Sequence, residues 1–195
     1  NQGRYDEAET LYLQALDMYK KLLGDEHPSV ASSLHNLAGL YNNQGRYDEA
    51  ETLYLQALEM RKKLLGDEHP SVASSLNNLA RLYHNQGRYD DAEPLYLQAL
   101  DMRKKLLGDE HPDVATSLNN LAVLYCNQGR YDEAETLYLQ ALDMYKKLLG
   151  DEHPSVASSL HNLAGLYNNQ GRYDEAETLY LQALEMRKKL LGDEH

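Results

Sequence analysis

The single cysteine of the sequence, Cys126, comes first among the side chains that can do chemistry, because a thiol beside a histidine can act as a nucleophile. Cys126 ends the run Val-Leu-Tyr-Cys, and His84 ends the run Arg-Leu-Tyr-His 42 residues earlier, so the two hold equivalent positions in adjacent copies of one pattern. Such a pair also needs a carboxylate that orients the imidazole and donors for an oxyanion. The surrounding sequence offers neither. We therefore predict that the protein is not an enzyme and that Cys126 is a small side chain on a helix.

The loop Asp25-Glu26-His27 is the second candidate for chemistry, and it recurs in every copy of the pattern. Its carboxylate oxygens and imidazole nitrogen are possible ligands for a divalent cation. A solvated turn that precedes a capped helix explains the same residues better, and the sequence has neither paired cysteines nor a His-Glu-x-x-His helix. We predict no metal ion and no other cofactor.

Composition narrows the class of partner. The chain has 195 residues, 31 acidic and 19 basic, and its net charge of −12 opposes attraction to phosphate backbones and anionic lipids. We therefore expect no nucleic acid and no membrane as partners. One cysteine cannot form an internal disulfide, and no apolar run is long enough for a signal peptide or a membrane span. These features predict a cytoplasmic protein.

The chain is one motif written repeatedly, and this repetition defines the elements that position any site. A 42-residue unit starts at Asn1 and returns at Asn43, Asn85, Asn127 and Asn169. Only nine of the 42 positions vary, and residues 1–69 recur unchanged as residues 127–195. A unit this short cannot bury its own apolar face, so stacked copies must share a core. We predict a single array over 1–195, with an unpaired helix and linker at 1–26 and complete repeats at about 27–68, 69–110, 111–152 and 153–194.

Each unit predicts two helices. Helix A covers roughly residues 28–43, because Pro28 suits a first helical turn and apolar residues follow at helical spacing. Helix B covers roughly residues 46–65 and ends at Gly66, which we expect to be a left-handed cap. Pro94 stands in a later helix B and should have little effect if that helix starts late. Short connections make consecutive helices antiparallel, so the fold class is all-α.

The segment Asn36-Leu37-Ala38, Tyr41, Gly45-Arg46-Tyr47-Asp48-Glu49-Ala50, Tyr54, Ala57-Leu58 resembles a tetratricopeptide repeat, and the resemblance covers the whole chain. The period is 42 residues instead of about 34. This longer form is similar to the repeats of kinesin light chains, which carry a comparable Leu-Gly and His-Pro linker, and to the sensor arrays of multidomain signalling NTPases. The resemblance implies a right-handed superhelical solenoid whose concave side is lined by the A helices.

The differences between copies gather on one face of helix A. Beyond its first turn, helix A varies at four places spaced three, four and three residues apart. At about 100° per residue these places fall within an arc of roughly 80°. In the family that the chain resembles, the matching positions line the concave groove. Leaving out the conservative Ser/Thr position, the predicted ligand-binding residues are His35, Gly39, Asn42, Asn77, Arg81, His84, Asn119, Val123, Cys126, His161, Gly165 and Asn168.

A fixed scaffold with one variable face suits recognition, so we predict a non-enzymatic scaffold that binds a peptide or protein in this groove. Arg81 can hold a carboxylate with two hydrogen bonds, and the Asn side chains can bridge a peptide backbone. Some members of the family hold a terminal carboxylate with lysines and asparagines. Arg81 and Asn77 match that pattern in part, but the lysines are missing, so we do not expect the chain to bind chaperone tails.

Two alternatives stay open. The chain opens on an unpaired helix B and starts in mid-repeat, so we expect it to be part of a longer array, and its exposed ends would favour end-to-end self-association. The near-identity of the copies also suits an array made to study the folding of repeat proteins. One further position, where Tyr19 alternates with Arg61 and Arg103 near the end of helix B, marks an edge contact or has no role.

Overall fold

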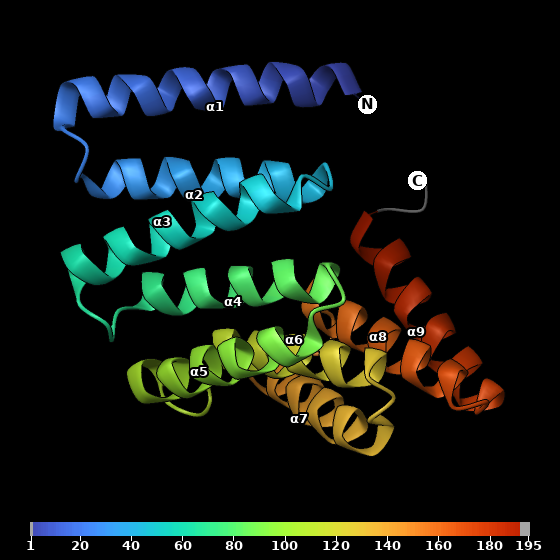
Figure 1. Ribbon diagram of the computed structural model, residues 1–195. Helices are drawn as coiled ribbons and strands as arrows, with labels where there is room; N and C mark the ends of the chain where they lie inside the picture. Colours follow the sequence, from blue (N-terminus) through green and yellow to red (C-terminus); the bar gives the residue numbers. More distant parts are fainter. Residues whose placement is uncertain (1, 192–195) are drawn as a thin grey trace. The chain divides into compact units, whose positions relative to one another are not determined.

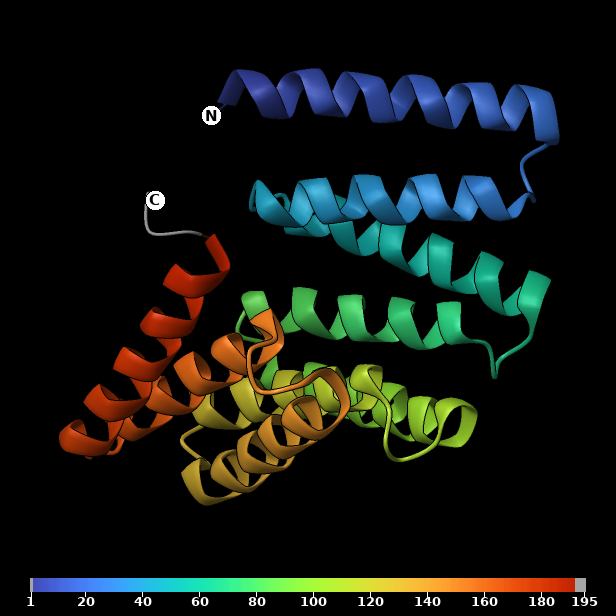
Figure 2. The same cartoon turned by 180° about the vertical axis from the view of Figure 1, so that it is seen from behind.

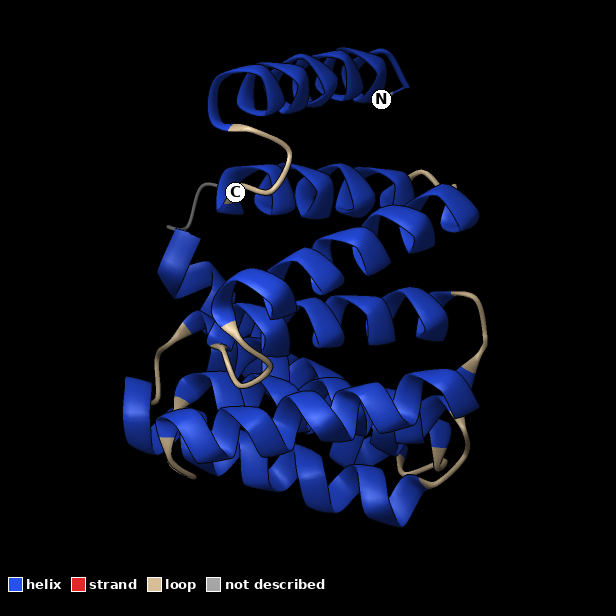
Figure 3. Ribbon diagram, turned by 60° about the vertical axis from the view of Figure 1, so that its left-hand side comes forward, coloured by secondary structure: helices blue, strands red, loops and turns tan. Residues whose placement is uncertain are grey.

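The fold is built from helical hairpins joined by short loops. The computed structural model describes residues 2–191, and within them it has nine helices and no strands (Figure 1, Figure 3). The first helix of each pair, called an A helix here, is α2 (Pro28–Asn43), α4 (Pro70–Asn85), α6 (Pro112–Asn127) or α8 (Pro154–Asn169). The B helices are α1 (Gln2–Leu23), α3 (Tyr47–Leu65), α5 (Tyr89–Leu107), α7 (Tyr131–Leu149) and α9 (Tyr173–Leu191). The all-α class and the helix pairs are confirmed.

A histidine caps the start of every A helix. The Nδ1 atom of His27 accepts a hydrogen bond from the Ser29 N–H at 3.2 Å, and Pro28 follows the cap at the first helical position. His69, His111 and His153 make the same contact in the other A helices. A side-chain acceptor at this position satisfies one of the free N–H groups of the first turn. The Asp-Glu-His loop is therefore a helix cap, and among the described residues no cluster of three metal-ligating side chains occurs.

Helices α1, α3, α5 and α7 each end at a glycine with a positive φ, a conformation that strains any other residue. Gly66 has φ 87° and ψ 161°, and its N–H bonds the Lys62 carbonyl. Its positive φ agrees with the sequence prediction, but its ψ lies far from the left-handed helical value, so the expectation of a left-handed cap is wrong in detail.

Small side chains let the two helices of a pair approach closely. Ala38 of α2 and Ala50 and Ala57 of α3 are fully buried. Val30 and Leu34 pack with Ala57 in one cluster between the helices. Each fully buried Val or Leu contributes about 1.5–3 kcal/mol. These contacts hold the A helix against its partner and fix which of its faces stays open.

A three-residue link, called the seam here, joins each of α1, α3 and α7 to the hairpin that follows it. The Tyr41 hydroxyl donates to Glu9 Oε1 at 2.9 Å, and Arg46 Nη1 donates to Glu9 Oε2 at 2.7 Å. The Arg46 guanidinium lies 3.9 Å above the centre of the Tyr41 ring. Burial and the neighbouring Glu9 raise the pKa of the Tyr41 hydroxyl. The same seam recurs with Tyr83, Arg88 and Glu51, and with Tyr167, Arg172 and Glu135.

Helix α5 differs from its counterparts by an internal proline. It begins at Tyr89, at the same place in the repeat as α3 and α7, so it does not start late as Pro94 had suggested. Pro94 therefore lies inside the helix. At the equivalent positions Thr52 and Thr136 donate a hydrogen bond to the carbonyl four residues earlier.

The chain divides into two compact units, residues 1–102 and 103–195, with the division inside α5. In the first unit α2 packs between α1 and α3, and α3 contacts α4. In the second unit α7 packs between α6 and α8, and α8 pairs with α9 (Figure 2). The single continuous array and its superhelical winding stay predictions. Among the described residues, no helix has the length and apolar character needed to cross a membrane.

Candidate functional site

A polar hollow opens between the A helices of the first unit. Its volume is about 280 Å³. The lining residues come from α1, α2, α3 and α4, and they are Tyr12, His35, Asn36, Gly39, Leu40, Asn43, Tyr54, Asn78 and Arg81. Three of them, His35, Gly39 and Arg81, belong to the predicted variable strip. No carboxylate lines the hollow, although the chain as a whole is strongly acidic.

His35 is held in place on one wall of this hollow. Its Nε2 lies 2.7 Å from the Asn78 Nδ2, and its Nδ1 lies 3.4 Å from Arg61 Nη1. The imidazole also meets the Tyr54 ring edge-on, with 5.2 Å between the centroids. Burial, together with Arg61 and Arg81, lowers the pKa of His35 to about 4. The imidazole is therefore neutral near pH 7, and its Nε2 accepts from the Asn78 amide.

Gly39 forms the part of the wall that leaves space. A Cβ at this position would lie 3.4 Å from the Tyr54 hydroxyl, which is ordinary van der Waals contact. The side chain of Tyr54 is 1% exposed, and burial raises the pKa of its hydroxyl while Arg81 lowers it. Because the equivalent position carries Val123 in α6, the fold accepts a larger side chain here. The absence of one at Gly39 keeps the hollow open.

Arg81 is the cation at the mouth of the hollow. Its side chain is exposed, and within the described residues no carboxylate lies at ion-pair distance from it. This distinguishes Arg81 from the seam arginines, each of which pairs with carboxylates. Because the Arg81 guanidinium is exposed and has no carboxylate partner, it presents N–H groups to solvent in the planar arrangement that suits a carboxylate.

A row of invariant asparagines, not recognised in the sequence, joins successive A helices through the variable strip. Asn85 donates to Asn42 Oδ1 at 3.1 Å, and in the second unit Asn162 donates to Asn119 Oδ1 at 3.2 Å. Each pair spans 43 residues, as the His35 contact with Asn78 does. The sequence did contain a signal for these links. Asn78 and Asn85 stand at positions that are asparagine in every copy, although the positions next to them vary.

Two of the predicted contact residues are buried: Asn42 is 5% exposed and Asn77 is 8% exposed. Both were expected to line the groove, and Asn42 instead lies at the contact between α2 and α4, where it accepts from Asn85. His84 is half-buried, lies 5.6 Å from the ring of Tyr89, and its pKa is lowered by burial.

The other six predicted residues lie in the second unit. Cys126 Sγ accepts from Asn169 Nδ2 at 3.5 Å. His161 is exposed and packs edge-on against Tyr180, whose hydroxyl lies 3.6 Å from a Cβ built on Gly165. Asn119 and Val123 are half-buried, and Asn168 lies beside an apolar hollow on α9. The lining of that hollow contains no arginine.

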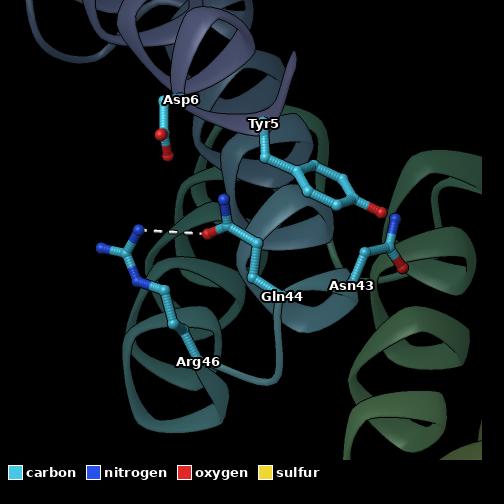
Figure 4. A pocket seen from close by; sticks show the side chains of 5 residues that line it. All are labelled: Tyr5, Asp6, Asn43, Gln44 and Arg46. Carbon is cyan, nitrogen blue, oxygen red and sulfur yellow. Dashed lines mark hydrogen bonds between the residues drawn. The ribbon is translucent and has the colours of Figure 1, made fainter. Parts of the chain in front are cut away.

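A different hollow, near the end of α2, has a structural role. It is lined by Tyr5, Asp6, Asn43, Gln44 and Arg46 (Figure 4). Arg46 donates to Gln44 at 3.1 Å, and it also bonds Glu9 and Glu49. Four of its five N–H donors are used and two carboxylates balance its charge, so this arginine has a structural role.

Comparison with known proteins agrees with the repeat geometry. A sequence model of the tetratricopeptide repeat matches residues 1–63, 29–105, 71–147 and 113–189. No curated protein matches the chain.

Among the solved structures that resemble this chain, two match nearly its whole length. BtubC (BKLC) from P. vanneervenii is 30% identical, with a TM-score of 0.80, and the match covers 98% of this chain and 76% of that chain. A protein of Podosopora anserina, described as a kinesin light chain with nearly identical TPR-like repeats, is 35% identical, with a TM-score of 0.74 and coverage of 97% and 90%. The resemblance found in the repeat motif is confirmed. The chain belongs to the tetratricopeptide repeat family.

Proposed function

We propose that the chain is a non-enzymatic scaffold that binds a peptide or protein partner at the hollow around Gly39, with Arg81 as its principal contact. Tetratricopeptide repeats are generally interaction or scaffold modules. The observation that carries the proposal is the combination of an open, acid-free hollow with an exposed arginine that has no carboxylate partner in the described residues.

The chemistry of the hollow suits an extended backbone that carries a carboxylate. Arg81 can bind the carboxylate with two parallel hydrogen bonds. The amides of Asn36 and Asn43, which line the same hollow, each offer a donor and an acceptor to a peptide bond. The space left by Gly39 accepts a small side chain. The rigid helix pairs present these groups with little loss of entropy on binding.

The test replaces Arg81 with Val, the residue that α6 carries at the equivalent position. A peptide library is selected against the natural chain, and each selected peptide is then titrated against Arg81→Val. A charge-assisted hydrogen bond contributes about 1.5–3 kcal/mol, so binding should weaken by about 10-fold to 100-fold. Unchanged affinity for all selected peptides would refute the assignment.

Two controls separate binding from folding. Arg81→Val should keep the helical circular dichroism, because the equivalent position already carries Val123. The unfolding midpoint measures the cost of losing the bond to the Tyr54 hydroxyl. Gly39→Val should reduce binding by filling the hollow, whereas Gly165→Val, which makes the same change in the second unit, should leave binding unchanged.

End-to-end self-association is the second candidate, and the exposed Leu11 and Leu22 of α1 and Leu181 of α9 favour it. End-to-end association would pack the B helix α9 of one copy against the B helix α1 of the next. Within each unit the helix pairs in contact are an A helix with a B helix or two A helices, so a contact between two B helices has no counterpart there. We therefore rank it below ligand binding. Sedimentation velocity at rising concentration decides, since a constant coefficient would exclude self-association. A cytoplasmic location stays part of the proposal.

A further inference from the structure

One leucine of every B helix stays exposed. These leucines are Leu13, Leu55, Leu97, Leu139 and Leu181, and their exposed fractions are 45, 44, 43, 45 and 58%. Helix α3 packs against α2 and α4, and α7 packs against α6 and α8, yet their leucines are as exposed as that of α1. The packing of the repeats therefore does not cover this position, and its exposure is not caused by a missing neighbour.

The exposed leucine of α3 lies midway between two opposite charges on the same face. Asp48 lies seven residues before Leu55, and Lys62 lies seven residues after it. At about 100° and 1.5 Å per residue, both charges lie within about 20° of Leu55 around the helix and about 10 Å from it along the axis. Thr52 and Glu59 are exposed on the same face. These five residues, Asp48, Thr52, Leu55, Glu59 and Lys62, are called the α3 strip here.

The same spacing of aspartate, leucine and lysine recurs in the other B helices, but α3 has the most complete strip. Helix α5 has Pro94 in place of the threonine, and α7 has the shorter Asp143 in place of the glutamate. Helices α1 and α9 each pack against one A helix, whereas α3 packs against two. Helix α3 is therefore the B helix on which we place a contact.

Neither charge at the ends of the α3 strip has an ion-pair partner within residues 2–191. Their neighbours in sequence, Glu49 and Lys63, are both paired. Asp48 and Lys62 are 14 residues apart. This places them about 21 Å apart along the helix, too far to pair with each other. The helix dipole favours an acid at the start and a base at the end. It does not require either charge to share a face with an exposed leucine.

The α3 strip is complementary to itself when two copies of α3 run antiparallel. A two-fold axis between the two Leu55 side chains brings Asp48 of each copy opposite Lys62 of the other. Glu59 then faces the uncharged Thr52, so no two like charges meet. A parallel pairing would instead place Asp48 opposite Asp48 and Lys62 opposite Lys62. The strip therefore favours one orientation, and every contact in it occurs twice, as in isologous interfaces.

We propose that the α3 strip is an interface with a second copy of this chain, in which the two α3 helices pair antiparallel around Leu55. The occupant is the same chain because the order of charges in the strip matches its own reverse. The net charge of −12 opposes the approach of two copies. Salt at about 0.15 M screens exposed charges that are more than about 8 Å apart, so the dimer should form at physiological ionic strength.

Sedimentation equilibrium at rising concentration and about 0.15 M salt tests the dimer. The natural chain should reach a dimer and stop there, because a two-fold contact closes. Leu55→Gln should raise the dissociation constant at least tenfold. Leu64→Gln is the matched control, since Leu64 is 37% exposed and lies on the opposite side of α3. A chain that stays monomeric, or that grows beyond a dimer with no effect of Leu55→Gln, overturns the proposal.

Charge reversal tests the pairing of Asp48 with Lys62. Asp48→Lys alone and Lys62→Asp alone each place like charges opposite one another, so each variant should dimerise at least tenfold more weakly. A mixture of the two variants has unlike charges at both ends of the contact and should form a mixed dimer with natural affinity. Circular dichroism of each variant alone checks its folding. Two folded variants that do not associate on mixing would refute the antiparallel register.

Disulfide trapping locates the two-fold axis. In a Cys126→Ser background, Leu55→Cys should form a linked dimer, because the two side chains meet at the axis. Leu64→Cys lies nine residues away. Its two copies would be about 27 Å apart along the helices, so it should not link. Equal linking of the two variants shows random collision and overturns the proposal. Faster linking of Leu139→Cys would place the contact on α7 and overturn the assignment to α3.

Discussion

At the scale of single residues, His35 shows how a neighbouring repeat changes the chemistry of a side chain. Its imidazole is neutral because it is buried beside Arg61 and Arg81, and its contact with Asn78 uses the neutral form. His161 stands at the equivalent position and is exposed. The same residue type therefore has two different environments within one repetitive chain.

This difference predicts a pH effect on stability. The pKa of His35 is about 4 in the folded chain and about 6.5 when unfolded, so between these values the unfolded chain binds the extra proton. The free energy of unfolding should fall by about 1–3 kcal/mol as the pH drops from about 6.5 to about 4. Urea unfolding of the natural chain and of His35→Asn at several pH values measures it.

His35→Asn removes the titrating imidazole and keeps an acceptor for Asn78, because Asn119 at the equivalent position accepts from Asn162 in the same way. Other groups titrate in this pH range in both chains. The effect of His35 is therefore the difference between the two stability profiles. Parallel pH profiles for the two chains would show that His35 is not responsible.

At the scale of one element, α5 continues through a proline that breaks the local pattern. Thr52 and Thr136, at its position in other B helices, bond the carbonyl one turn earlier with the side chain. Pro94 lacks both that hydroxyl and a backbone N–H, so the Asp90 carbonyl loses its partner inside the helix.

Pro94→Thr should therefore stabilise the chain by about 1–3 kcal/mol, since a proline inside a helix costs about 3 kcal/mol and this one is exposed near the first turns. Thr136→Pro, the reverse change at the same position of α7, should destabilise by a similar amount. Thermal and urea unfolding of both variants give the two values. A neutral Pro94→Thr combined with a damaging Thr136→Pro would mean that α5 has adapted to its proline.

The elements were predictable and the contacts between them were not. Pro28, Gly45 and Gly66 mark helix ends chemically, which is why the predicted boundaries agree with the structure to about one residue. The burial of Asn42 and the role of Asn85 depend on how two A helices, 43 residues apart in sequence, are spaced. No pattern within one repeat contains that distance.

At the scale of the whole molecule, stability comes from links between neighbouring repeats. The seams join residues 32 and 37 positions apart, and the asparagine row joins residues 43 positions apart. Each of these contacts joins one hairpin to the next within a unit. Such arrays gain stability as a sum of repeat and interface contributions.

Cutting one seam should therefore weaken the coupling without unfolding a hairpin. Glu51→Ala removes the acceptor for the Tyr83 hydroxyl at 2.8 Å and for Arg88 at 2.9 Å. Two hydrogen bonds of about 0.5–1.5 kcal/mol each are lost, so we expect a loss of about 1–3 kcal/mol and a broader urea transition. Glu49→Ala removes only a contact within one repeat, to Arg46, and should leave the width of the transition unchanged. Equal broadening in both variants would contradict the role of the seam.

The sameness of the junctions has a consequence for inheritance. Positions 42, 84, 126 and 168 carry Asn, His, Cys and Asn, yet each is followed by the same Asn-Gln-Gly-Arg-Tyr. If recombination in the gene duplicates or deletes a whole 42-residue unit, the new junction has the same Asn-Gln-Gly-Arg-Tyr as the old ones. The number of repeats can therefore change while each remaining hairpin keeps the same junction sequence to the next one.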